Sequence, residues 1–100
     1  MRYMYHATPM ENLYSIMDEG IHPGTDGLVY MCEKPEDSAK FLAVRMVREI
    51  LVCKIKIYKK DEKLITETFD HSERFFKCRA FGYHGHIKPE LIEGYYKYEI

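Results

Sequence analysis

The sequence predicts an α+β fold, with a split β-sheet and two helices early in the chain. Apolar residues at helical spacing dominate the first half, and strand-like alternation dominates the second half. Helices and strands segregated in this way favour α+β over a doubly wound parallel sheet, in which they alternate. The 100 residues contain no internal repeat and no linker, so we expect a single domain over residues 1–100.

The chain begins with a predicted short strand at residues 2–6 and a predicted helix at about residues 9–19. Thr8 and Glu11 have the spacing of a capping box, in which two side chains bond to backbone N–H groups at a helix start. We expect this helix to end at Gly20. The apolar residues that would share one face are Met10, Leu13, Tyr14 and Met17.

A loop at residues 21–27, rich in glycine and proline, precedes a predicted strand at residues 28–32. A second helix is predicted to begin near Pro35, with two acidic residues in its first turn, where the helix dipole favours them. Arg45 falls away from the apolar stripe of this helix. The stripe that the spacing predicts is Ala39, Leu42, Ala43, Met46, Val47 and Ile50.

Strands are expected to dominate the rest of the chain. Residues 51–57 alternate between apolar residues, which we expect to face inward, and lysines, which we expect to face outward. The further segments predicted are a charged connection at 59–63, a short strand or turn at 64–69, a strand at 75–81 broken at Gly82, a helical turn at 89–92 and a closing strand at 94–100.

Composition narrows the class of protein. A net charge of −1 gives no global electrostatic footprint for non-specific nucleic-acid binding, although a local basic face is compatible with it. The three cysteines are widely spaced, which fits reduced thiols and not a disulfide framework or a zinc cluster. Because no apolar run reaches membrane-spanning length and the N-terminus lacks a signal peptide's apolar core, we expect a cytoplasmic protein with no membrane partner.

Three motifs stand in a fixed order over roughly residues 3–93. They are residues 5–8 with the helix after them, residues 29–32 with the helix after them, and the late turn at residues 85–92. The ordered set resembles the small members of the ADP-ribosyltransferase superfamily, namely RNA 2′-phosphotransferases and DNA-targeting ADP-ribosyltransferases. The resemblance implies an ADP-ribosyltransferase-like split β-sheet. It also implies an NAD-binding transferase that passes ADP-ribose to a macromolecular or phosphate acceptor, or that cleaves NAD. The acceptor would be a nucleic acid or a protein.

The resemblance also implies roles for particular residues. In the family's arrangement His6, together with Ala7 and Thr8, binds the ribose next to nicotinamide. Tyr30 stands at the position that packs on nicotinamide, and Phe41 lies on the helix that completes the cofactor site. NAD is then the substrate, and no metal ion is implied.

The chain departs from the family's pattern in two places. RNA 2′-phosphotransferases carry an arginine just before the second strand, where this chain has residues 25–28 without one. Classical transferases carry a glutamate on the strand before the final turn, and residues 75–84 contain no acid. Glu73 and Arg79 are the nearest candidates for the catalytic acceptor side. The alternative is a catalytically degenerate module that binds a nucleotide or an RNA end.

Other polar groups have more than one interpretation. His84 and His86 could bind a metal, act as acid and base at an RNA end, or form a polar rim on a ligand cleft. Lys54 and Lys56 share one strand face and could contact phosphates or simply face solvent. The sequence has no glycine-rich phosphate loop, so a dinucleotide would not be held in a Rossmann crevice.

Overall fold

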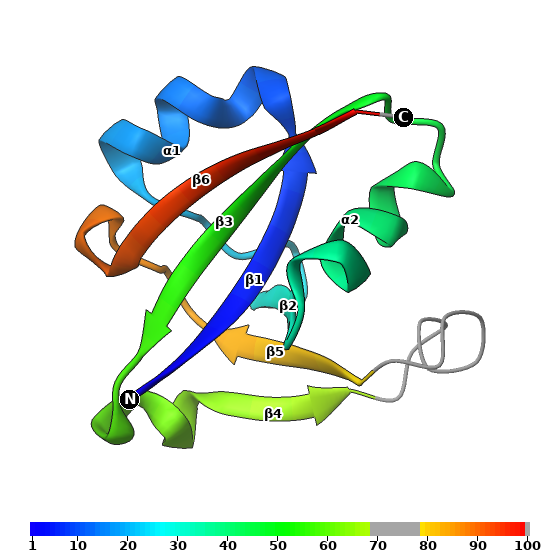
Figure 1. The fold of residues 1–100 in the computed structure, drawn as a ribbon. Helices are drawn as coiled ribbons and strands as arrows, with labels where there is room; N and C mark the ends of the chain where they lie inside the picture. The colour runs from blue at the N-terminus through cyan, green and yellow to red at the C-terminus, as the bar shows by residue number, and fades with distance from the viewer. Residues whose placement is uncertain (69–78, 100) are drawn as a thin grey trace.

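The computed structural model describes residues 1–68 and 79–99, which form one six-stranded antiparallel sheet with helices on both faces (Figure 1). The α+β prediction is confirmed. The strands are β1 (Arg2–Pro9), β2 (Leu28–Cys32), β3 (Glu49–Ile57), β4 (Ile65–Thr68), β5 (Ala80–His84) and β6 (Ile92–Glu99). The α-helices are α1 (Leu13–Glu19) and α2 (Pro35–Ala43), and short 3₁₀ helices span Met10–Asn12, Lys59–Leu64 and Pro89–Leu91. No helix in this described part is long and apolar enough to cross a membrane.

The sheet consists of two halves joined at a narrow place. Its strand order is β4-β5-β2-β1-β3-β6, so the junction between the halves is the β1–β2 pair. These two strands are in register at Tyr5 and Cys32 alone, whereas β1 and β3 pair along the whole of β1. Figure 1 shows the halves running in clearly different directions. The predicted split is therefore a partial separation within one continuous sheet.

The two faces of the sheet bury two separate clusters. On one face, Met4 and the alternating apolar residues of β3 pack with Val29, Met31 and residues from α1 and β5. This confirms the inward alternation predicted for residues 51–57. On the other face α2 covers Ile50 and Val52, so β3 is buried on both sides near its start. The first cluster anchors β1, and the second anchors both β1 and α2, the elements that frame the site described below.

The first helix begins later than the sequence predicts. Thr8 and Pro9 belong to β1, which continues its pairing with β3 up to the Pro9–Ile50 pair. No capping box forms, and the Thr8 hydroxyl instead accepts a hydrogen bond from the Asn12 amide at 2.8 Å. The predicted apolar face was also wrong in part, because Tyr14 is 80% exposed while Ile16 is buried. Gly20 ends the helix as predicted.

The second helix begins at Pro35 as predicted but ends at Ala43, well before Ile50. The amide of Val47 donates to the Leu42 carbonyl, and the amide of Met46 donates to the Ala43 carbonyl. With Met46 at a φ of 65°, this is a Schellman turn, which usually has glycine at that position. The predicted stripe was therefore wrong beyond the helix, because Met46 is exposed and Ile50 lies in β3.

The strand predicted at 75–81 is confirmed at Ala80 and Phe81, and it continues further than predicted. Residues 69–78 lie outside the described part of the chain, and β5 runs from Ala80 through Gly82 to His84. Gly82 pairs with Tyr30 and does not break the strand. A side chain at Gly82 would begin 3.1 Å from a methyl group of Leu28, so a glycine here makes room for that side chain.

Candidate functional site

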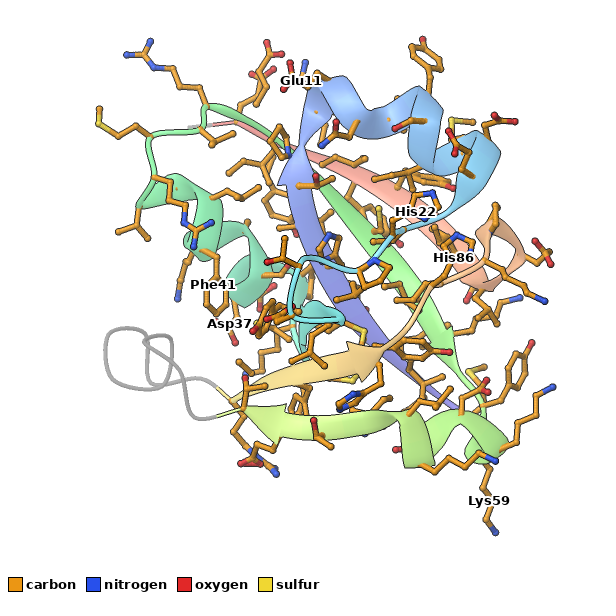
Figure 2. All side chains as sticks on the ribbon, turned by 180° about the vertical axis from the view of Figure 1, so that it is seen from behind. Glu11, His22, Asp37, Phe41, Lys59 and His86 are labelled. Carbon is orange, nitrogen blue, oxygen red and sulfur yellow. The ribbon has the colours of Figure 1, made fainter. Side chains whose placement is uncertain are left out.

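A cleft of about 330 Å³ opens beside the place where β1 and β2 separate. It is framed by the two strands, by α2 and by the start of β5. Figure 2 shows the ring of Phe41 projecting from α2. The lining residues are His6, Ala7, Tyr30, Met31, Cys32, Ser38, Phe41, Arg45 and Ala80. Four residues predicted for the site, from three elements distant in sequence, are thus brought together: His6, Ala7, Tyr30 and Phe41.

His6 connects the two strands just beyond their last paired residues. Its Nδ1 lies 2.7 Å from the carbonyl oxygen of Tyr30, and a carbonyl can only accept a hydrogen bond. Nδ1 therefore carries the proton, and a neutral ring has Nε2 as an acceptor. The side chain of His6 thereby continues the link between β1 and β2 where the backbone ladder has stopped, and it offers the cleft an acceptor nitrogen.

The His6 ring is held in its neutral form. Loss of hydration on burial lowers the pKa of the imidazole, and the hydrogen bond to the Tyr30 carbonyl opposes this only in part. A neutral imidazole can accept a hydrogen bond from a ligand hydroxyl and adds no positive charge to the cleft.

This lowered pKa predicts a stability change with pH. The unfolded chain takes up a proton at His6 near the ordinary histidine pKa of about 6.5, whereas the folded chain does so only at lower pH. Stability from this group is therefore present above about pH 6.5 and is lost as the pH falls toward the folded-state pKa. We expect the free energy of unfolding, measured with urea, to fall more steeply between about pH 7.5 and 5.5 in the wild type than in His6→Asn. Equal slopes would contradict the prediction.

Tyr30 stands at the edge of the cleft with 42% of its surface exposed. Its hydroxyl donates to the carboxylate of Asp26, which also accepts the amide of Leu28 at 3.1 Å. These two bonds, the one from Tyr30 first, lower the pKa of the Asp26 carboxyl, so it is ionised at neutral pH. The loop before β2 thus fixes the direction of the Tyr30 ring. The sequence does not predict a role for Asp26.

Arg45 supplies a positive charge to the cleft lining and was not predicted for the site. It lies in the turn that follows α2, and its amide donates to the Leu42 carbonyl at 3.0 Å. Its spacing relative to the apolar stripe indicated a solvent-facing helical residue. Because α2 ends early, Arg45 lies in a turn and lines the cleft. No feature of the sequence marks the turn at Met46 that ends the helix. Ser38, also in the lining, is buried and donates to the Pro35 carbonyl at 2.7 Å.

Two of the predicted site residues that the structure describes, Thr8 and Arg79, are not among the cleft's lining residues. Thr8 is buried and bonded to Asn12, as described above. Arg79 pairs with Glu67, with its Nε 2.9 Å from the carboxylate, and lies over the ring of Phe81 at 5.2 Å. Its neighbour Ala80 does line the cleft. Glu73, the predicted catalytic acid, lies outside the described residues.

His84 and His86 contact different neighbours. The Nε2 of His84 is 3.1 Å from the Thr66 hydroxyl, on β4. His86 stacks on His22 with 4.6 Å between ring centroids, and Figure 2 shows these two rings close together. Its Nε2 also bonds to the Glu19 carbonyl. In residues 1–68 and 79–99, no three His, Cys, Asp or Glu side chains are grouped to hold a metal ion.

Comparison with known proteins gave no match, either to a protein-family model or to a curated protein.

Proposed function

We propose that this protein binds NAD in the cleft between β1, β2 and α2 and acts as an ADP-ribosyltransferase-type transferase. The observation that supports this most is the convergence of His6, Tyr30 and Phe41 on one cleft from three separate elements. The same three positions belong to the sequence motifs that resemble that superfamily.

The cleft's dimensions and charges suit one half of the dinucleotide. A volume of about 330 Å³ is near the lower end for small-molecule sites, so it fits nicotinamide and its ribose better than all of NAD. The exposed ring of Tyr30 offers a stacking surface for nicotinamide, and Nε2 of His6 offers an acceptor for a ribose hydroxyl. Arg45 would meet the adjacent phosphate.

The neutral state of His6 suits the chemistry. The C1′–N bond of the ribose breaks, nicotinamide leaves with the bonding electron pair, and the acceptor's nucleophile forms the new bond to C1′. Positive charge develops on the sugar as the bond breaks, and a protonated histidine beside it would repel that charge. A neutral imidazole instead holds the sugar by a hydrogen bond, so positioning can lower the barrier.

The second candidate is a binding module of the same fold without turnover. The nine described lining residues contain no carboxylate, and the nearby Asp26 is engaged with the Tyr30 hydroxyl. Of the two predicted acceptor-side groups, Arg79 pairs with Glu67, and Glu73 lies outside the described residues. Release of free nicotinamide distinguishes the two candidates, since both would bind NAD.

The test is a titration of the purified protein with NAD, followed by NMR chemical shifts and by calorimetry. We expect shifts centred on His6 and Tyr30, and Tyr30→Ala should weaken binding about tenfold because it removes a stacking ring worth about 1–3 kcal/mol. Tyr14→Ala is the matched control, because Tyr14 is an exposed tyrosine on α1 that does not line the cleft. No binding of NAD, or an equal loss in both variants, would refute the proposal.

A further inference from the structure

Part of the sheet's α2-side face is left uncovered. The helix packs on β1 and β3 near Tyr5, Ala7 and Val52, and next along the two strands the register pairs Tyr3 with Lys56, neither of which belongs to this cluster. In Figure 1, α2 lies to the right of β1, β3 and β6. We call Tyr3, Lys54, Lys56 and Tyr96 the open face. Two tyrosines and two lysines alternate on it across three adjacent strands.

Tyr96 lies flat on this face. It pairs with Val52, and Gly94, two residues earlier on β6, pairs with Lys54. A Cβ placed on Gly94 would lie 3.0 Å from the Tyr96 hydroxyl oxygen and 3.2–3.3 Å from ring carbons. The ring therefore covers the glycine, and 43% of the residue's surface remains exposed. A ring lying along the strand presents an aromatic surface on which a planar group can stack.

Lys54 contacts one of these rings. The ammonium of Lys54 lies 4.1 Å from the centre of the Tyr3 ring, a cation–π distance. Glu93 accepts a hydrogen bond from the Tyr3 hydroxyl, which raises the pKa of that phenol and places one acid at the edge of the open face. Two lysines against one acid leave the surface locally positive, although the chain as a whole carries −1.

We propose that the open face binds single-stranded nucleic acid. Bases would stack on Tyr96 and Tyr3, and the phosphates between them would meet Lys54 and Lys56. β1 and β6 lie on either side of β3, about 9.6 Å apart at about 4.8 Å per strand spacing, so their rings can engage two unpaired bases of one strand. A duplex hides its base faces inside its own stack and cannot use flat rings in this way. The inference does not depend on NAD, because none of these four residues lines the cleft.

The experiment measures fluorescence anisotropy of labelled single strands of about 12 nucleotides, one DNA and one RNA, at about 50 mM salt. We expect saturable binding of at least one strand and weaker binding of the matching duplex. Preference for one sugar identifies the nucleic acid that the face recognises. Chemical shifts of the wild-type protein should move at Tyr3, Lys54, Lys56 and Tyr96, and this mapping needs no variant.

Variants test the two kinds of contact separately. Tyr96→Leu should lower affinity about fivefold or more, while Tyr96→Phe, which keeps the ring, should stay near the wild-type value. Lys56→Gln should lower affinity and reduce the salt dependence by about 0.7 in log–log slope, as expected for one lost phosphate contact. Tyr14→Ala and Lys63→Gln, both at exposed positions outside the open face, are the controls.

Three results would overturn the inference. They are no binding of either single strand, equal or tighter binding of the duplex, or equal losses in the controls and the open-face variants. NAD titration of Lys56→Gln should match the wild type. This keeps failure here separate from failure of the proposed NAD site.

Discussion

Replacing Gly20 with alanine is expected to destabilise the protein by about 3–5 kcal/mol, a sum of backbone strain and a disrupted hydrogen bond. Gly20 has a φ of 82° and a ψ of −161°, a region open almost exclusively to glycine. An added Cβ would lie 2.1 Å from the carbonyl oxygen of Ile87, far inside contact distance. That same oxygen accepts the amide of Ile21 at 2.8 Å, so the bridge between these segments must give way.

Gly27 provides the matched control. Its φ of 80° is nearly that of Gly20, but a Cβ there would meet no atom within 4 Å. Gly27→Ala should therefore cost about 1 kcal/mol, the price of a left-handed conformation alone. Urea denaturation of both variants gives the comparison. Similar losses in the two would show that the close approach to Ile87 does not decide the stability of this corner.

The position of Gly20 gives a physical reason for two of the sequence motifs. The segment after the first helix and the late turn are more than sixty residues apart, yet Ile21 and Ile87 form a two-bond bridge. Both isoleucines are buried in the larger core cluster, and Pro89 approaches the same glycine. The two motifs are therefore two sides of one contact. Their joint presence in a sequence indicates this corner of the fold, whatever the chemistry of the cleft.

The strands were predictable because their signal is local. β2 has the bounds that the sequence predicts, and the alternation in β3 follows directly from one face being packed on the core. The helix ends were not predictable in the same way. Thr8 and Glu11 carry a helix-start pattern, but pairing of β1 with β3 through Pro9 overrides it. Met46 occupies a left-handed turn without the glycine that would have announced the end of α2.

Only some residues of the candidate site were predictable, because only some of them belong to motifs that are visible in the sequence. His6, Ala7, Tyr30 and Phe41 stand in motifs of fixed order, so resemblance could select them. Arg45 reaches the cleft through the unannounced turn after α2, and Asp26 acts through a side-chain bond to Tyr30 across a loop. Neither relation has a sequence spacing of its own. Thr8 is the opposite case. It belongs to a motif, but its hydroxyl bonds to the side chain of Asn12 and it does not line the cleft.

The second large effect is expected at His6. His6→Asn should lower the rate of nicotinamide release from NAD about 100-fold, because about 2.7 kcal/mol of ribose positioning is lost with Nε2. The asparagine amide retains an N–H that can donate to the Tyr30 carbonyl, so the link between β1 and β2 need not be lost. Stability above pH 7 should therefore change far less than activity.

His84→Asn is the control for this variant, since His84 bonds to Thr66 and does not line the cleft. It should retain the wild-type rate. If the protein binds NAD without turnover, the same contrast should appear as a loss of affinity in His6→Asn alone. Full activity and full affinity in His6→Asn would show that the imidazole serves only to join the two strands. The cleft would then have to hold its ligand through Tyr30, Phe41 and Arg45 without a ribose contact at His6.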